Sequence, residues 1–296
     1  MLQPKPEPTA TPAARPTAHP IATPIAWPLE AIWQATAPTL AGFTCEMLPT
    51  VDSTNSELMR RFKNGQTEPT LLVAEHQSAG RGRLGRQWIG SRGDSLMFSL
   101  GMLLSPAAWS GLSLAVGVSL AESLDPACDA QRYIGLKWPN DLYLSGGTGP
   151  EQKLAGVLIE TATWEGTRYV VIGVGINIRA ISLLDSGTSA VPPGQLQSLL
   201  PELNAASALL RIVPPLVQTV LAFSDFGFAP FQARFAQRDV LANRAVTLSD
   251  GLEGTAHGVS EEGALLVQTA SGMQVVASSE VSVRLAPRRA RAAKAS

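Results

Sequence analysis

Short apolar segments separated by polar turns follow one another along most of this chain. Residues 71–75 and 95–104 are apolar runs of strand length, and residues 112–124 form a longer apolar run that predicts a buried helix. Ser53 or Thr54 occupies the N-cap position expected before a short helix. The pattern therefore alternates strands with helices and predicts an α+β domain.

The second half of this domain contains further strand-like segments. Residues 133–138 predict a strand that Pro139 stops, since proline cannot donate to a sheet ladder. A glycine-rich stretch at 145–149 separates two apolar segments and predicts a hairpin. Residues 209–223 have helical periodicity, whereas residues 181–204 give no clear assignment. The remaining strands of this half are predicted at 143–144, 153–161 and 168–173.

After Phe235 the chain changes to short strands separated by turns that contain Gly, Asp and Ser, which predicts a small all-β barrel. At the other end, residues 1–28 are rich in Pro, Ala and Thr and are expected to form a disordered arm before a short helix at 29–37. The last residues, 287–296, are expected to be a basic, solvated tail. The strands of the barrel are expected at 246–248, 256–259, 264–268, 274–277 and 281–285.

Composition and charge narrow the functional classes. The 296 residues are 45% hydrophobic and 16% charged, with a formal net charge of −1. A nearly neutral globular chain has no overall attraction to nucleic acid or anionic membranes, so neither DNA nor a membrane is an expected partner. Its two cysteines and three histidines form no disulfide framework or zinc pattern. The apolar run at 111–121 is too short to span a bilayer and no signal-peptide pattern begins the chain, so a cytoplasmic location is expected.

The segment GRGRLGRQW, Gly80–Trp88, has the glycine spacing of a dinucleotide-binding turn but carries three arginines. A Rossmann turn requires a helix after its third glycine, and here a turn-rich segment and a strand follow instead. Arginine–glycine repeats that bind RNA are long and disordered, whereas this loop is short and lies between two apolar strands. A glycine-hinged loop that folds around an anion through Arg81, Arg83 and Arg86 is the chemical interpretation that remains. The alternative is a surface loop with solvated arginines.

Four other stretches place polar groups or glycines at the ends of predicted elements. Lys153 would begin a buried strand, which requires a partner for its ammonium group. Each stretch alone also fits a structural role, as a helix cap, a proline-stopped strand, an edge lysine or a β-bulge. The stretches are DSTN at 52–55, KWPND at 137–141, KLAG at 153–156 and GVGIN at 173–177.

Taken in order with GRGRLGRQW, these stretches resemble the biotin protein ligase family over roughly residues 43–235. The β-rich remainder resembles the C-terminal SH3-like domain of that family. The resemblance implies an α+β fold in which a catalytic domain with a mixed or antiparallel sheet, of the class II synthetase-like biotin/lipoate ligase type, precedes a small SH3-like β-barrel. We therefore expect a catalytic biotin- and ATP-binding domain at 29–235 and an SH3-like domain at 236–286.

Enzymes of this family attach biotin to a lysine of the biotin carboxyl carrier protein domain of acetyl-CoA carboxylase or a related carboxylase. Biotin and ATP first form biotinyl-5′-AMP and pyrophosphate, and the carrier lysine then displaces AMP. The resemblance implies ATP and biotin as substrates, with Mg²⁺. It also implies fixed cations that bring two anions together, and a glycine-hinged loop that closes over the intermediate.

The resemblance further implies which residues form the site. Trp88 should cover the adenine, Asn140 and Asn177 should read its edge, and Asp141 should orient the cationic cluster or help to hold Mg²⁺. The groups expected to act in the reaction are Arg81, Arg83, Lys137 and Lys153. Those expected to bind biotin are Ser53, Thr54, Asn55, Gln77, Gly80, Arg81, Arg83, Lys153, Gly156 and Gly173. Those expected to bind ATP or the adenylate are Arg83, Arg86, Trp88, Lys137, Asn140, Asp141, Lys153, Gly175 and Asn177.

Other functions stay open at this stage. Lipoate protein ligases share the fold and the adenylation chemistry, although the arginine-dense loop and the KWPND and KLAG pair favour biotin. A nucleic-acid-binding regulator and a Ser/His/Asp hydrolase receive less support from the sequence. The Pro/Ala-rich segment before DSTN leaves no room for a DNA-binding domain, so a monofunctional ligase is expected. A sheet-edge homodimer is a further expectation from the family, and Leu84 leaves this loop with one arginine fewer than its most basic relatives.

Overall fold

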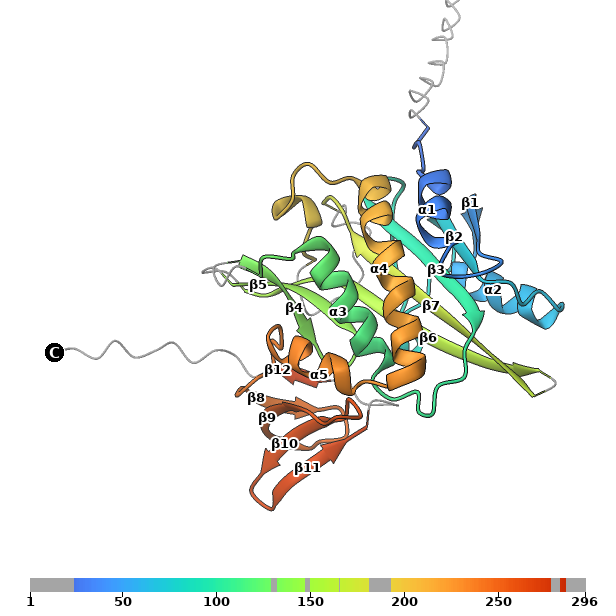
Figure 1. Ribbon diagram of the computed structural model, residues 1–296. Helices are drawn as coiled ribbons and strands as arrows, with labels where there is room; N and C mark the ends of the chain where they lie inside the picture. The colour runs from blue at the N-terminus through green and yellow to red at the C-terminus, as the bar shows by residue number, and fades with distance from the viewer. Residues whose placement is uncertain are drawn as a thin grey trace, which may run out of the picture.

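The computed structural model describes residues 24–128, 132–146, 150–164, 166–180, 193–277 and 283–285. These residues form a large sheet, a small sheet and the helices that pack on them (Figure 1). The chain completes the large sheet first and enters the small one after the last helix. The helices are α1 (Leu29–Thr36), α2 (Thr54–Lys63), α3 (Leu112–Leu124), α4 (Ala205–Phe226) and α5 (Ala229–Ala236).

The large sheet has seven strands in the order β1-β2-β3-β7-β6-β5-β4. β1 and β2 are parallel and the other neighbouring pairs are antiparallel, which confirms the predicted mixed sheet. The parallel pair needs a crossover connection, and α2 provides it. The strands are β1 (Thr44–Val51), β2 (Thr70–Gln77), β3 (Ser95–Leu103), β4 (Arg132–Lys137), β5 (Asp141–Gly146), β6 (Gln152–Trp164) and β7 (Thr167–Asn177).

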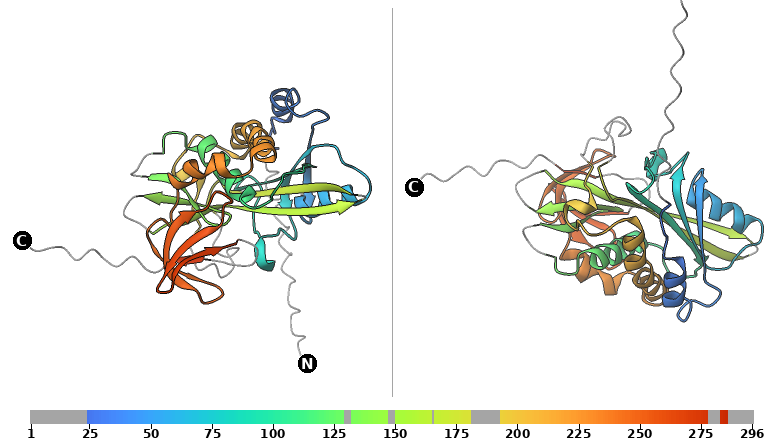
Figure 2. Two further views of the ribbon diagram at one scale, coloured as in Figure 1. Left: turned by 60° about the horizontal axis from the view of Figure 1, so that its bottom comes forward. Right: turned by 90° about the horizontal axis from the view of Figure 1, so that it is seen from above.

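Different helices cover the two faces of this sheet, as the views in Figure 2 show. Leu96 and Phe98 of β3 belong to the main core, which they share with α1, α3 and α4. The alternation of a strand places Ser99 on the opposite face. On that face Phe62 of α2 stacks on Tyr169 of β7, with ring centroids 4.5 Å apart. The face under α2 is therefore only partly covered by a helix, and the candidate site lies there.

Most predicted elements are present, and α3 spans the predicted residues 112–124. β1 gave no distinct sequence signal because its residues are half-buried or exposed and form no apolar run. α5 also escaped prediction, since it has only eight residues. α4 begins earlier than predicted because Asn204 and Ser207 form a capping box at its start.

α4 is the one helix among the described residues that is long and apolar enough to cross a membrane. Half of its apolar window is buried inside the protein. The helix packs along α3 and α1, as the core helix of a folded domain does.

The small sheet contains the five strands expected after Phe235, all antiparallel, in the order β11-β10-β9-β8-β12. This arrangement agrees with the predicted SH3-like domain. The expected arm up to residue 23, residues 181–192 of the unassigned 181–204 segment and the basic tail lie outside the described residues. The strands are β8 (Ala245–Leu248), β9 (Glu253–Val259), β10 (Leu265–Thr269), β11 (Gly272–Val276) and β12 (Val283–Leu285).

Buried polar contacts join the two sheets. The indole Nε1 of Trp138 donates to the carbonyl of Gly263, 3.1 Å away, in the turn between β9 and β10. Arg238, which follows α5, is 3% exposed and pairs with Asp125 at 3.1 Å. The backbone N–H of Leu136 in β4 donates to the carbonyl of Arg238 at 2.7 Å. The connection to the small sheet is therefore anchored on the same strand that leads into KWPND.

Asp239 lies in this connection, and only one of its two carboxylate oxygens has a hydrogen-bond partner among the described residues. Its Oδ1 accepts a hydrogen bond from the backbone N–H of Leu241 at 2.8 Å, and its Oδ2 is buried without a partner among the described residues. Burial raises the pKa of Asp239 from 3.8 to about 6. Since the unfolded chain ionises at the lower pH, ionisation favours unfolding. The resulting loss of stability begins above pH 3.8 and is complete above about pH 6.

We expect Asp239→Asn to raise the free energy of unfolding at pH 7.5 by up to about 3 kcal/mol and to change it little near pH 3.5. Asparagine keeps the acceptor for Leu241 and removes the charge. Urea unfolding at the two pH values measures the difference, with Asp250→Asn in an exposed turn as the control. An equal gain at both pH values would contradict the assignment.

Candidate active site

Two adjacent rows of small residues cross the large sheet on the face that carries α2. In one row Ser99 of β3 pairs with Gly173 of β7. In the next row Gly175 of β7 pairs with Gly156 of β6. Without bulky side chains at these positions, other elements can approach the backbone of the sheet. We call these four residues the small-residue strip.

Side chains from α2 and from the glycine-rich loop lie directly over the strip. A Cβ atom at Gly173 would be 2.2 Å from Oδ1 of Asn55, and a Cβ atom at Gly175 would be 2.3 Å from the ring of Trp88. Trp88 also reaches Gly156, whose Cβ would lie 3.5 Å from the ring. The glycines expected to bind biotin or ATP thus allow a close approach to the backbone of the sheet, which the side chains of Asn55 and Trp88 make here.

The start of α2 brings buried polar groups to one end of the strip. Ser53, Thr54 and Asn55 are each 3% exposed. Ser53 is the N-cap predicted from DSTN, and its hydroxyl faces the N–H of Ser56 at 3.5 Å. The backbone N–H of Thr54 donates to Oε1 of Gln77 at 2.7 Å. Four of the residues expected to bind biotin are therefore together, at a helix N-terminus.

Glu160 of β6 is the carboxylate at this end of the strip. Its Oε2 accepts from Nδ2 of Asn55 at 2.8 Å, and its Oε1 lies 2.9 Å from Nη2 of Arg81. Arg81 was predicted to bind a ligand carboxylate or phosphate. In this structure it binds a protein carboxylate, and half of its side chain is exposed.

GRGRLGRQW folds as a tight hairpin over the site. The N–H of Trp88 donates to the carbonyl of Gly80 at 2.9 Å, and the N–H of Gly82 donates to the carbonyl of Arg86 at 2.7 Å. A Cβ atom at Gly80 would lie 2.2 Å from the carbonyl oxygen of Trp88, so this position requires glycine. A single 3₁₀ turn at 83–85 closes the hairpin, and no Rossmann helix follows, as predicted.

Arg83 extends from this hairpin toward KWPND. Its Nη1 lies 3.4 Å from Oδ1 of Asn140, whose Nδ2 donates to the carbonyl of Val157 at 2.8 Å. Burial lowers the pKa of Arg83, and the nearby Asp141 opposes that effect. An arginine in this setting keeps its charge. The loop therefore delivers a partly desolvated cation to the start of β5.

Lys153 and Lys137 converge on the same place. Nζ of Lys153 lies 2.7 Å from Oδ1 of Asp141, which confirms that this lysine has a partner. Nζ of Lys137 lies 5.3 Å from the ring centroid of Tyr143. The pKa of Lys137 is lowered mainly by burial and further by Lys153 and Arg86, while Asp141 acts in the opposite direction. Burial also raises the pKa of Tyr143, so its phenol stays neutral.

The expected Mg²⁺ finds little support in the protein groups. Asp141, the predicted ligand, is already paired with Lys153. Among the described residues, no three His, Cys, Asp or Glu side chains gather closely enough to hold a metal. Mg²⁺ prefers several oxygen ligands. A metal cage built from protein side chains does not fit the described residues.

Asn140 and Asn177 were predicted to read the adenine edge. In the structure each amide already donates to a backbone carbonyl, that of Asn177 to Lys153 at 3.2 Å. Asn177 is also buried, at 6% exposure. Both amides therefore hold β5, β6 and β7 together in this structure, and adenine recognition by them stays a prediction.

Three residues of the site were not singled out from the sequence. Ser99 is fully buried in an apolar strand, Glu160 follows the apolar run of KLAGVLIE, and Tyr143 lies beside Lys137. A lone polar residue in an otherwise apolar strand was the available signal for the first two. Tyr143 gave no signal because its role depends on a neighbouring strand.

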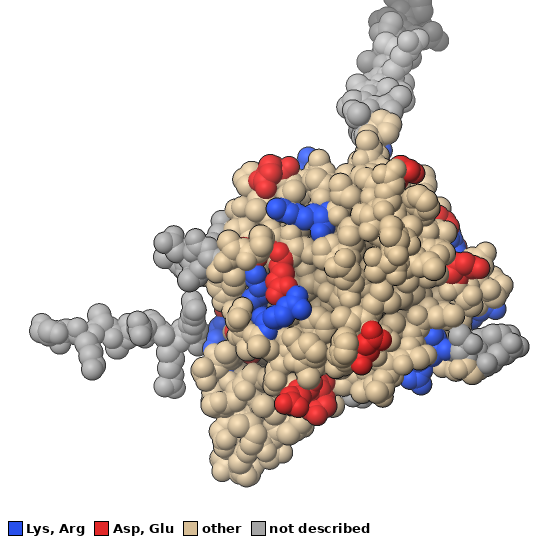
Figure 3. Space-filling model, in the orientation of Figure 1, with Lys and Arg blue, Asp and Glu red and all other residues tan. Residues whose placement is uncertain are grey.

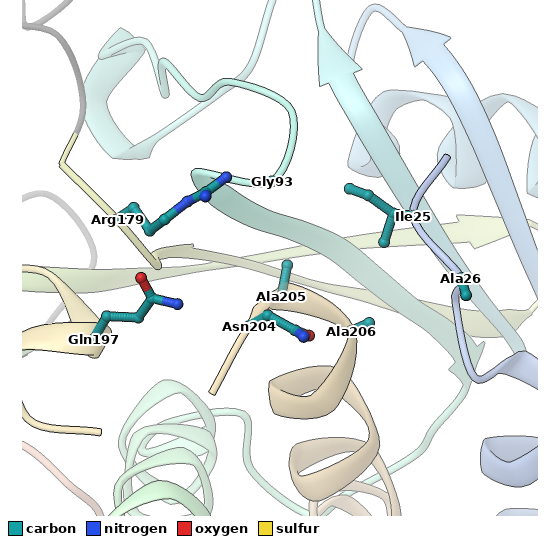
Figure 4. A pocket seen from close by; sticks show the side chains of 8 residues that line it. All are labelled: Ile25, Ala26, Gly93, Arg179, Gln197, Asn204, Ala205 and Ala206. Atoms are coloured by element: carbon teal, nitrogen blue, oxygen red, sulfur yellow. The ribbon is translucent and has the colours of Figure 1, made fainter. Parts of the chain in front are cut away.

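A cavity of about 310 Å³ lies elsewhere, at the start of α4 (Figure 4). Its lining includes Ile25, Arg179 and Asn204 but none of the predicted site residues. Arg179 is paired with Asp94 at 3.0 Å. On the face over α3 and α4, charged side chains of both signs are scattered and form no basic patch (Figure 3). Neither feature competes with the small-residue strip as the chemical centre.

The site therefore has two chemically different ends. At one end, buried hydroxyl and amide groups surround the start of α2 and suit a neutral polar ligand group. At the other end, Arg83, Lys137 and Lys153 gather around Asp141 and suit the meeting of two anions. Trp88 lies between them as an aromatic cover over the two glycines.

Comparison with known proteins places this chain among the biotin ligases. Residues 47–177 match the model of the Biotin/lipoate A/B protein ligase family, and residues 242–284 match that of the Biotin protein ligase C terminal domain. The bifunctional ligase/repressor BirA of Escherichia coli is 34% identical over 259 residues, which cover 83% of this chain and 76% of BirA. The biotin–[acetyl-CoA-carboxylase] ligase of Paracoccus denitrificans is 30% identical, over 79% of this chain and 98% of its own length.

Solved structures agree with the sequence comparisons. The biotin protein ligase of Aquifex aeolicus, in complex with biotin and ATP, superposes with a TM-score of 0.66 at 29% identity. The match covers 82% of this chain and 99% of that one. By its sequence, its mixed sheet and its C-terminal sheet, this chain belongs to the biotin protein ligase family.

Proposed function

We propose that this protein joins biotin to a lysine of a biotin carboxyl carrier domain at the expense of ATP. In the first step a biotin carboxylate oxygen attacks the α-phosphorus of ATP and pyrophosphate leaves. In the second step the carrier amine attacks the acyl carbon of biotinyl-AMP, loses a proton and releases AMP. The observation that carries the proposal is the pair of chemically opposite ends on one small-residue strip.

The polar end of the strip suits the fused ureido ring of biotin. That ring is neutral and carries two N–H donors and one carbonyl acceptor, and it needs buried partners for each. Thr54, Gln77 and the N-terminus of α2 offer such partners. Asn55 lies over Gly173, so biotin would pack beside this side chain or displace it from the strip.

The cationic end suits the biotin carboxylate and the α-phosphate. Both are anions, and their approach is opposed by repulsion that preorganised cations offset. We assign Arg83 and Lys153 to the reacting groups and Lys137 to the departing pyrophosphate, because the three cations gather around Asp141. Asp141 holds Lys153 in place at 2.7 Å, so its proposed role is to orient this cluster.

Arg81 receives a smaller role in this proposal than the resemblance implied. Glu160 already neutralises it, and both lie at the polar end of the strip. Binding of a ligand carboxylate by Arg81 would require it to leave Glu160. We therefore assign the primary electrostatic role to Arg83, Lys137 and Lys153. Mg²⁺, if it takes part, would be held by the phosphate oxygens of ATP.

The acceptor of biotin is proposed from the names of the relatives. The Paracoccus relative is named for acetyl-CoA carboxylase, which supports a carboxylase carrier as the acceptor. A cytoplasmic location, a homodimer, and ligase activity without repressor activity stay predictions. Lipoate is the alternative acid, and the named relatives favour biotin over it.

We expect the purified protein to catalyse isotope exchange between pyrophosphate and ATP when biotin is added. The exchange requires reversible adenylation, so it tests the acid and the first step together. Lipoate at the same concentration should give at least tenfold less exchange, because it lacks the ureido donors. Equal exchange with both acids would favour the lipoate alternative.

We expect Arg83→Ala to fold normally but to release biotinyl-AMP roughly 10- to 100-fold faster, because one charge-assisted contact is lost from a desolvated site. Dissociation of radiolabelled adenylate measures the rate. Arg211→Ala, on the exposed surface of α4, is the matched control. Unchanged retention in Arg83→Ala would remove this residue from the proposed site.

We expect Gly175→Ala to raise the KM for ATP by roughly tenfold, because the new methyl group would displace Trp88 from the sheet. The KM values from the exchange reaction measure this effect. Gly156→Ala is the matched comparison, since its Cβ would meet the same ring at an ordinary contact distance of 3.5 Å. A larger defect in Gly156→Ala than in Gly175→Ala would show that Trp88 is not the adenine cover.

A further inference from the structure

A chain of short polar contacts runs beneath the start of α2, and Ser99 is at its centre. The hydroxyl of Ser99 lies 2.6 Å from Oδ1 of Asn55 and 2.7 Å from Oγ1 of Thr54. Oγ1 of Thr54 in turn lies 3.1 Å from Oε1 of Gln77. Three oxygen–oxygen contacts therefore depend on the protons of two hydroxyl groups.

The orientation of Asn55 decides where the proton of Ser99 goes. Nδ2 of Asn55 faces two acceptors, Oε2 of Glu160 at 2.8 Å and the carbonyl of Leu158 at 3.3 Å. The amide nitrogen must therefore be on that side, and Oδ1 must face Ser99. An amide oxygen can only accept, so Ser99 gives its single proton to Asn55.

The same count then fixes Thr54 and Gln77. Because the proton of Ser99 is used, the single hydroxyl proton of Thr54 has two acceptors within reach, Ser99 at 2.7 Å and Gln77 at 3.1 Å. The shorter contact is the one that needs a proton between its oxygens, so we assign the proton of Thr54 to Ser99. Oε1 of Gln77 is identified as the amide oxygen because it accepts the backbone N–H of Thr54 at 2.7 Å. Oγ1 of Thr54 and Oε1 of Gln77 are thus left 3.1 Å apart with no proton between them.

We propose that Ser99 is a positioning residue for substrate specificity. By directing the proton of Thr54 away from Gln77, it keeps Oγ1 of Thr54 and Oε1 of Gln77 as a pair of acceptors for one N–H of a cyclic urea. The inference rests on the proposed function, because it names which part of biotin this end of the site recognises. It makes Ser99 a determinant for a donor at that ring position.

The position of Ser99 in the sheet supports this role. It is fully buried in β3, directly opposite Gly173, whose missing side chain allows Asn55 to reach it. A serine without a polar partner would be unfavourable here. Ser99 instead contacts two of the residues expected to bind biotin, and it contributes no surface of its own to a ligand.

The test compares wild-type protein with Ser99→Ala in the biotin-driven exchange reaction. In the variant the proton of Thr54 can turn to Gln77, and the acceptor pair is lost. We expect the KM for biotin to rise roughly 10- to 100-fold, with the KM for ATP and the maximal exchange rate nearly unchanged. Ser119→Ala in α3 is the matched control, because Ser119 is also buried but has no hydrogen-bond partner among the described residues.

A second measurement separates positioning from a general structural effect. Two cyclic carbamate analogues of biotin each replace one ureido N–H by an isosteric oxygen and keep the carboxylate. The wild type should reject the isomer whose oxygen faces Thr54 and Gln77, since acceptors would then oppose each other. Ser99→Ala frees the proton of Thr54 to donate, so the preference for biotin over that isomer should fall at least tenfold.

The outcomes are distinct. A biotin KM within twofold of wild type in Ser99→Ala, or an equal loss for biotin and both carbamates, would overturn the inference while leaving the proposed function intact. A wild type without biotin-driven exchange would overturn both. Should Ser99→Ala not fold, Ser99→Cys, whose thiol is somewhat larger than the hydroxyl and a weaker donor, is used with the same expectations.

Discussion

The site depends on the absence of side chains at three glycines in the middle of the large sheet. Strand β7 is mostly buried and pairs with β6, and Gly156, Gly173 and Gly175 leave the backbone of these two strands without side chains on one face. This space is what lets Asn55 descend from α2 and Trp88 descend from the loop. A Cβ atom at Gly173 would overlap Asn55, and one at Gly175 would overlap Trp88. Glycine at these two positions is therefore required for this packing.

Electrostatics explains how the cations at the other end of the strip are held close together. Arg83, Lys137 and Lys153 repel one another, and burial further disfavours the charges of Arg83 and Lys137. The carboxylate of Asp141 offsets part of this repulsion. A site prepared in this way needs little reorganisation when a charged substrate arrives. At the polar end of the strip, Glu160 neutralises the charge of Arg81 in a similar way.

Contacts from the small sheet also help to hold the cationic end of the site in place. Trp138 lies between Lys137 and Pro139 in KWPND, and its indole donates to the turn at Gly263. The chain that enters the small sheet is bound to β4 through Leu136, one residue before Lys137. The end of β4 that carries Lys137 is therefore held from both sides, which limits the freedom of this lysine.

The sequence by itself determined the elements and the family. Apolar runs gave β2, β3 and α3, and the helix cap at Ser53 gave the start of α2, because these signals depend on neighbours along the chain. The order of DSTN, GRGRLGRQW, KWPND, KLAG and GVGIN identified the family, and with it came the expectation that arginines and lysines gather to bind an anion. β1 and α5 lacked a local signal of that kind.

The tertiary structure alone decided which groups meet. Asn55 reaches Glu160 across more than a hundred residues of chain, and the Arg81 side chain pairs with the same carboxylate. Ser99 joined the site because a glycine on the next strand left it accessible to α2. Such contacts depend on strand register and on which face each side chain occupies across the sheet. No local pattern of residues contains that information, because register between distant strands is fixed only when the whole core packs.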